Sequence, residues 1–297
     1  MNEEIVTFGR TRPLVGILHQ PEPSAVQPDL PVVLLLNAGI LHRVGPNRLY
    51  VRIARVLADS GFQVLRFDLG GIGDSQDLAA AKQSASFFDD TQEAMEMLRQ
   101  RAGARRFMLM GICMGARIAL EVASRDARVD SLVLMEGIYV KSARYHISRM
   151  LDIRKWARVL TGRNHKMKTL RKAVTRRVGR VMGRARPAEV RSSRPLVLSE
   201  DSGSRNMRET LQALLGRGTK ILLAFRDGNE IAHNYRLRRE GDETTAVGLP
   251  NGLQVSFVRF ADHTFTPLIS QQLLLQVTMK WIADTHLRRR APLKVAA

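Results

Sequence analysis

Seven short apolar runs, with helical patterns between them, constrain the fold of this chain more than any other feature. Most of the runs are apolar at successive positions, which is typical of strands buried on both faces of a parallel sheet. The runs span residues 14–18, 32–36, 62–67, 106–111, 131–136, 220–225 and 253–260. Helical periodicity appears at residues 47–60, 86–102, 206–216 and 266–286. Strands that alternate with helices predict an α/β fold with a mostly parallel, doubly wound sheet.

The strand predicted at 106–111 leads directly into Gly111-Ile112-Cys113-Met114-Gly115, and a helical pattern follows at once. A strand–turn–helix with this spacing is typical of a nucleophile elbow, a tight turn that exposes its central side chain. Glycines on both sides let the neighbouring backbone pass without a clash with a Cβ atom. Because a helix N-terminus favours a thiolate, Cys113, the single cysteine of the chain, is the predicted nucleophile.

This layout resembles the α/β-hydrolase superfamily, with cysteine where most members have serine, over residues 14–287 outside the basic segment described below. In its nucleophile it is similar to dienelactone hydrolases and to some acyltransferases. The stretches NAG-x-x-HRVGP-x-R and RFD-x-GG-x-GDS are similar to bacterial hydrolases encoded beside exosortase systems, which generally use serine. In the second stretch, we expect Asp68 and Ser75 to fix the backbone. The resemblance implies a triad in the order nucleophile, acid, histidine.

The resemblance places the catalytic histidine at His263, just after the last predicted strand and before the last helix. The acid should follow the strand at 220–225, where the loop RDGNE offers three candidates. Asp227 is favoured, because a carboxylate holds the imidazole tautomer and stabilises the imidazolium. Glu230 is an alternative, and so is Asn229, which aligns with the commoner acid position of the family. A further hypothesis moves the base from His263 to His42 or His233.

The oxyanion hole is expected to combine the amide of Met114 with that of Ile40, in the turn after the strand at 32–36. His42, Arg43 and Arg48 follow near the start of the next helix. These side chains are candidates to bind a carboxylate or phosphate of the substrate. The alternative is a solvated helix start without a ligand.

The charge of the chain is concentrated in one segment. The net charge is +19, and residues 141–194 contribute 18 Lys and Arg against two acidic residues. An apolar stripe at residues 167–181 predicts an amphipathic basic helix there. We therefore predict three segments: residues 1–136 as the first part of an α/β-hydrolase core, 137–205 as a basic helical cap, and 206–297 as the second part of the core.

These features together favour an enzyme that hydrolyses an ester or thioester, or transfers its acyl group, through an acyl-Cys intermediate. The expected partner is a small acyl substrate, linked to coenzyme A or to an acyl carrier, or an anionic membrane surface that the cap contacts. We expect no metal or cofactor. Nucleic acid is disfavoured, because aromatic residues are only 5% of the chain. The alternative is a catalytically weak binding module whose cap binds an anionic membrane, an acidic carrier protein or nucleic acid. The acidic N-terminus and the short apolar runs favour a cytoplasmic or membrane-peripheral protein.

Overall fold

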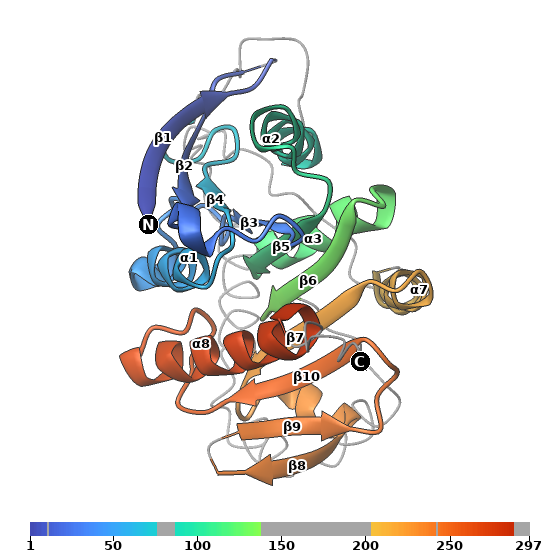
Figure 1. Cartoon of the computed structure of the whole chain (residues 1–297). Helices are drawn as coiled ribbons and strands as arrows, with labels where there is room; N and C mark the ends of the chain where they lie inside the picture. Colours follow the sequence, from blue (N-terminus) through green and yellow to red (C-terminus); the bar gives the residue numbers. More distant parts are fainter. Residues whose placement is uncertain (11, 76–86, 138–202, 242, 288–297) are drawn as a thin grey trace, which may run out of the picture. The chain divides into compact units, whose positions relative to one another are not determined.

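The computed structural model describes residues 1–10, 12–75, 87–137, 203–241 and 243–287 (Figure 1). The chain divides into two compact units, one of residues 1–140 with 204–297 and the other of residues 141–203. The predicted basic cap at 137–205, with its amphipathic helix, lies almost wholly outside the described residues, and its boundaries stay a prediction.

Ten strands form one sheet in the order β1-β2-β4-β3-β5-β6-β7-β10-β9-β8 (Figure 1). Their bounds are β1 Asn2–Phe8, β2 Leu14–Gln20, β3 Val32–Leu36, β4 Val64–Phe67, β5 Phe107–Ile112, β6 Val129–Met135, β7 Lys220–Arg226, β8 Arg236–Glu240, β9 Glu243–Val247 and β10 Leu253–Val258. The six strands β4, β3, β5, β6, β7 and β10 run parallel, and the two strands at each end of the sheet pair antiparallel. The predicted fold class, a mostly parallel doubly wound sheet, is confirmed.

Helices cover both faces of the sheet. The longer ones are α1 Leu49–Asp59, α2 Phe87–Ala102, α3 Met114–Arg125, α7 Gly203–Gly216 and α8 Leu268–Ile282. Short turns of helix are η1 Pro23–Ala25, η2 Pro46–Arg48, η3 Glu230–Asn234 and η4 Ala283–Leu287. One core cluster packs α2, α3 and α7 against the sheet, and a second packs α1 and α8 against the opposite face. The central strands are buried on both sides, which explains their continuous apolar sequences.

The sequence patterns did not predict three strands, β1, β8 and β9. In the edge strand β1 only Val6 and Phe8 are buried, so the strand has no continuous apolar run. All five residues of β8, which has the sequence RLRRE, are exposed. Charged edge strands of this kind resist pairing with other chains, and they lack the apolar run by which a buried strand is recognised.

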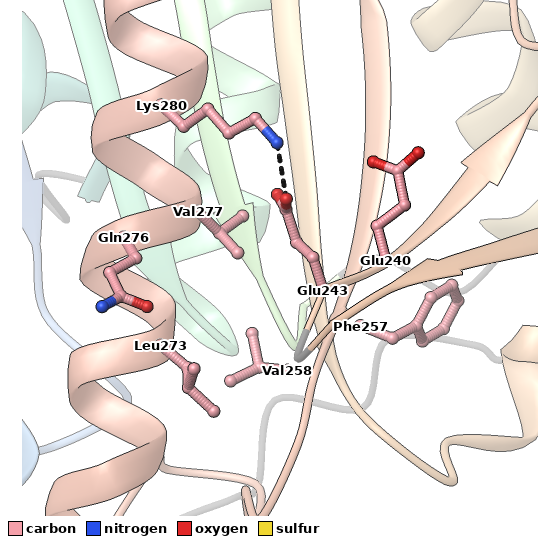
Figure 2. Close-up of a pocket in the computed structure, with 8 residues that line it drawn as sticks. All are labelled: Glu240, Glu243, Phe257, Val258, Leu273, Gln276, Val277 and Lys280. Atoms are coloured by element: carbon pink, nitrogen blue, oxygen red, sulfur yellow. Dashed lines mark hydrogen bonds and ion pairs between the residues drawn. The ribbon is translucent and has the colours of Figure 1, made fainter.

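The β8–β9 hairpin borders a hollow of about 220 Å³ beside α8 (Figure 2). Phe257 and Val258 of β10 line it together with Leu273, Gln276 and Val277 of α8. Lys280 Nζ lies 2.5 Å from Glu243 Oε2 across its rim. The hairpin is thus joined to the core through its pairing with β10 and through this ion pair.

The parallel strands place their carboxyl ends at one edge of the sheet, the usual position of ligand sites in open α/β sheets. Five neighbouring strands, β3, β5, β6, β7 and β10, deliver to this edge the segments that begin at residues 37, 113, 136, 227 and 259. All the described residues of the predicted triad and oxyanion hole belong to these segments.

Candidate active site

A tight turn lies between β5 and α3, with the strand–turn–helix geometry that the predicted nucleophile elbow requires. Cys113 occupies the N-cap of α3 with φ 54° and ψ −107°, a strained conformation for a residue that is not glycine. A Cβ atom on Gly111 would lie 2.3 Å from the carbonyl carbon of Gly115. A Cβ atom on Gly115 would lie 2.5 Å from the carbonyl oxygen of Leu36. The two glycines therefore allow the strand, the turn and the helix to pack at contact distance.

The fully buried Tyr50 of α1 supports the elbow from below. Its hydroxyl donates to the carbonyl oxygen of Leu36 at 2.8 Å and accepts from the amide of Ile112 at 3.0 Å. Burial raises the pKa of Tyr50 above its usual range, so the hydroxyl keeps its proton. This bridge fixes the end of β3 against the end of β5, and so fixes the two segments that carry the expected oxyanion-hole amides.

His263 pairs with a residue outside the predicted loop. Its Nδ1 lies 3.2 Å from Oε2 of Glu136, the residue that directly follows β6. The side chain of His263 is 47% exposed, whereas that of Glu136 is fully buried. Glu136 has φ 49°, a second strained position at this edge of the sheet. A histidine whose one nitrogen contacts a buried carboxylate presents its other nitrogen to the substrate side, as catalysis by a triad requires.

The segment that carries Glu136 is packed directly against the elbow. The amide of Cys113 donates to the carbonyl oxygen of Met135 at 2.8 Å, and the amide of Glu136 donates to Ala224 at 3.0 Å. Gly137 lies so close that a Cβ atom on it would stand 2.4 Å from the carbonyl oxygen of Cys113. Glu136 and Cys113 therefore belong to one rigid piece of the sheet edge.

Two residues at and after the end of β7, Arg226 and Asn229, also hold the carboxylate of Glu136. The amide of Arg226 donates to Oε1 at 2.6 Å. Asn229 Nδ2 lies 3.2 Å from Oε1 and 3.4 Å from Oε2. The guanidinium of Arg226 is 3.9 Å from Oε2. A buried carboxylate needs such donors, because without them its desolvation would be costly.

The RDGNE loop follows β7, where the catalytic acid was expected. No described contact joins its three candidate residues to His263. Asp227 is exposed; its amide continues the sheet pairing to Val258 at 2.7 Å, and its Oδ1 accepts from the amide of Gly228 at 2.9 Å. Glu230 is exposed at the start of η3, and Asn229 contacts Glu136. Among the described residues, His263 contacts the carboxylate of Glu136 and not that of Asp227. The role of Asp227 as the catalytic acid stays a prediction, which this geometry disfavours. One sequence feature could have identified Glu136: it is an ionisable residue directly after a buried apolar run.

The expected oxyanion loop follows β3 and is ordered by Asn37. The buried Asn37 Nδ2 donates to the carbonyl oxygen of Leu41 at 2.8 Å, and its Oδ1 accepts from the amide of Leu69 at 2.8 Å. Ile40 stands 89% exposed in the turn. Within the described part of the chain, the amides of Ile40 and Met114 donate to no acceptor, so both remain available to a ligand.

His42 and Arg43 are engaged with carboxylates. The amide of Arg43 donates to Oδ1 of the buried Asp68 at 2.6 Å, and its Nη1 contacts Oδ2 of Asp68 and, at 2.7 Å, Oδ2 of Asp74. His42 Nε2 lies 3.4 Å from Asp74 Oδ2. His42, Asp68 and Asp74 have the donor set of a cation site, but the Arg43 guanidinium already forms ion pairs with both carboxylates. His42 and Arg43 thus connect the loop after β3 to the loop after β4.

Arg48 differs from Arg43. It is exposed, has φ 61°, and forms the N-cap of α1. Its side chain makes no hydrogen bond or ion pair with the residues that the structure describes. Of the three predicted anion-binding residues, Arg48 is the one whose guanidinium has no acidic partner within the described ranges.

The glycine-rich turn after β4 has the structural role expected for Asp68 and Ser75. Ser75 Oγ donates to the carbonyl oxygen of Asp68 at 2.6 Å and accepts from the amide of Val15 at 2.9 Å. Among the described contacts, Cys113 Sγ and His263 do not form a hydrogen bond with each other. His233, the other alternative base, is exposed in η3.

Comparison with known proteins supports the same fold. A family model described as alpha/beta hydrolase fold matches residues 31–170. The chain is 27% identical over 116 residues to Esterase EstD of Thermotoga maritima, a match that covers 38% of this chain and 28% of that protein. It is 26% identical over 134 residues to Protein ABHD12B of Homo sapiens, which covers 43% of this chain and 36% of that protein. The chain thus spans about a third of the length of the curated relatives it matches.

Solved structures match over nearly the whole chain. A crystal structure of an α/β serine hydrolase without lid from Xanthomonas campestris has a TM-score of 0.52 at 15% identity, and covers 99% of this chain and 97% of that chain. The α/β hydrolase GrgF from Penicillium sp. sh18 has a TM-score of 0.53 at 14% identity, and covers 96% of this chain and 99% of that chain. The chain has the α/β hydrolase fold. No helix among its described residues has both the length and the apolar character needed to cross a membrane.

Proposed function

We propose that this protein is an acyl-transfer enzyme in which Cys113, His263 and Glu136 form the catalytic triad. The observation that carries the proposal is the contact between His263 and the buried Glu136, beside a strained cysteine at a nucleophile elbow. The similarity to an esterase over 116 residues agrees with it. The substrate is an ester or a thioester, and the product acceptor is water or another nucleophile.

The reaction begins when Nε2 of His263 takes the proton of the Cys113 thiol. The sulfur then bonds to the acyl carbon, and the carbonyl electron pair moves to its oxygen, which the amides of Ile40 and Met114 stabilise. When the tetrahedral intermediate collapses, the leaving alcohol or thiol takes the proton from His263. Glu136 accepts a hydrogen bond from Nδ1 throughout, so that Nε2 faces the sulfur.

An acyl-Cys thioester remains after this first half of the reaction. In the second half, water or another acceptor attacks the acyl carbon and gives its proton to His263, and the sulfur leaves and recovers that proton. Because a thiolate leaves readily from the tetrahedral intermediate, the site suits activated donors such as thioesters and enol lactones better than amides.

The basic segment at 141–194 suggests the kind of donor. Its net charge of +16 would attract coenzyme A, an acidic acyl carrier protein or an anionic lipid surface. The exposed Arg48, at the N-cap of α1, would contribute a further positive charge for such a donor. On this basis the protein works in the cytoplasm, either free or at a membrane surface, and binds a small acyl substrate with no metal or cofactor.

A second candidate function rests on the same charge. A catalytically weak hydrolase scaffold would then bind an anionic membrane, a carrier protein or nucleic acid through residues 141–194. Binding by charge neutralisation falls steeply with salt concentration, and the Cys113→Ala substitution would not change it.

Rates on a panel of activated esters and acyl-CoA thioesters test the proposal. We expect turnover by the wild type, none above background by Cys113→Ala, and weaker turnover by Cys113→Ser. If the folded wild type turns over no member of the panel and forms no acyl adduct, while salt-sensitive binding persists, the second candidate stands instead.

A further inference from the structure

We propose that Asn229 is a positioning residue that holds Glu136 in the orientation His263 needs. This inference rests on the function proposed above. Asn229 follows β7, and Glu136 directly follows the neighbouring strand β6. In the proposed arrangement Glu136 contributes the carboxylate, and the side chain of Asn229 contributes a hydrogen-bond donor to it.

The hydrogen bonds of Asn229 fix which end of its amide faces the carboxylate. Its side chain is 7% exposed. Oδ1 accepts from the amide of Ile231 at 3.1 Å, as an N-cap of η3. Because Oδ1 faces the amide of Ile231, Nδ2 faces Glu136. Nδ2 lies 3.2 Å and 3.4 Å from the two carboxylate oxygens. Nδ2 therefore bridges both oxygens and resists rotation of the carboxylate.

The backbone around Asn229 makes this support stiff. Its own amide donates to the carbonyl oxygen of Arg226 at 3.2 Å, and its carbonyl oxygen accepts from the amide of Ala232 at 2.9 Å. The backbone of Asn229 is thus hydrogen-bonded to a residue on each side of it along the chain. A donor held from both sides can direct the carboxylate, because its own movement is restricted.

An amide suits this position better than a carboxylate does. An acid at position 229 would place two carboxylates about as close as the present 3.2 Å contact, in a buried site. Like charges at that separation cannot both be ionised without a large cost. The asparagine instead gives the buried Glu136 a neutral donor, and leaves a single negative charge beside His263.

Two substitutions separate this role from support of the loop. Asn229→Ala removes the donor and the N-cap acceptor, whereas Asn229→Asp keeps an acceptor for the amide of Ile231 and loses the donor. For the full chain with an activated thioester, we expect either variant to lower kcat by about 10-fold or more, with KM within about twofold. Alkylation of Cys113 by iodoacetamide should slow in parallel. The matched control on the same loop, Asp227→Asn, should behave as the wild type in both measurements.

A double-mutant cycle with Glu136→Gln identifies the path of the effect. If Asn229 acts through Glu136, the combined loss in Asn229→Ala with Glu136→Gln will be well below the product of the single losses, by about 5-fold or more. Independent, multiplicative losses would overturn the proposal, and so would wild-type kcat and alkylation in Asn229→Asp. If Asn229→Ala does not fold, the cycle is run with Asn229→Asp, whose cap is kept. Failure of the wild type to turn over any thioester would instead refute the proposed function, before the variants are compared.

Discussion

Nδ1 of His263 lies 3.2 Å from Oε2 of Glu136, a fully buried carboxylate at the carboxyl end of β6. The strand order places Glu136 between the elbow at the end of β5 and the loops that follow β7 and β10. Hydrogen-bond donors from Arg226 and Asn229 offset the desolvation cost of this buried carboxylate. This geometry supports the proposed triad, in which the acid, Glu136, directly follows β6.

Substitution of the acid should reduce catalysis with little change in the fold. We predict that Glu136→Gln lowers kcat/KM by about 100-fold or more, because an amide no longer stabilises the imidazolium that forms at His263. Steady-state rates on an activated thioester measure this loss. Asp227→Asn, at the position that the sequence favoured, should stay within about twofold of the wild type. The reverse ranking of the two variants would place the acid back in the RDGNE loop.

The elbow should not tolerate a methyl group at its glycines. In Gly111→Ala or Gly115→Ala the new Cβ meets backbone at 2.3 Å or 2.5 Å, and backbone cannot move aside as a side chain can. We predict a loss of unfolding free energy of about 2 kcal/mol or more for each, measured by urea denaturation. Gly216→Ala is the matched control, because nothing lies within 4 Å of the position that its new methyl group would take at the end of α7. Equal stability of all three variants would contradict the close packing of the elbow.

The loops after β3 and β4 should depend on Asp68 for stability. Asp68→Asn leaves the largely buried Arg43 guanidinium without its main counter-charge, so we predict a loss of about 3 kcal/mol in the free energy of unfolding. Asp74→Asn removes an exposed partner of the same guanidinium and should cost less than about 1 kcal/mol. If Asp68→Asn instead kept its stability and changed only KM, Arg43 would be a substrate ligand, as its sequence position first suggested.

The buried His19 predicts a pH dependence of stability. Burial, together with the neighbouring Arg66, lowers the pKa of His19 from 6.5 to about 4, and Glu3 opposes this shift. The unfolded chain thus takes up a proton between these pH values that the folded protein does not, and folding stability falls as the pH drops from about 6.5 to 4. In His19→Gln, whose amide can still accept from Arg66 Nε, this contribution is absent. Urea titrations at pH 7 and pH 5 should therefore show a smaller decrease for the variant than for the wild type, and equal decreases would contradict the shift.

The central sheet and the elbow could be predicted from sequence because local patterns determine them. Strands such as β3 and β5 are buried on both faces, so every residue is apolar. Cys113 lies between two glycines, and this spacing is the sequence signature of the elbow. His263 follows the last parallel strand, where the family resemblance placed it. Edge strands such as β8 carry no such pattern, because exposure removes the requirement for apolar residues.

The partner of His263 could not be predicted in the same way, because it depends on the order of strands in space. Glu136 and His263 are 127 residues apart and meet because β6, β7 and β10 are neighbours. The same reason explains Arg43. The sequence suggested that the Arg43 guanidinium could bind a substrate, yet it pairs with Asp68, which lies 25 residues later and directly follows the adjacent strand β4. Charged residues near a site need the fold before their partners are known.

The formation of an acyl-enzyme on Cys113 is the most direct test of the proposed function. The folded protein is mixed with an acyl-CoA thioester or an activated ester, quenched in acid within the first turnover, and its intact mass is measured and mapped to a peptide. We predict a mass increase equal to the acyl group on the peptide that contains Cys113, and no increase in Cys113→Ala. An unmodified Cys113 across the panel, or an adduct that persists in Cys113→Ala, would contradict covalent catalysis at this residue.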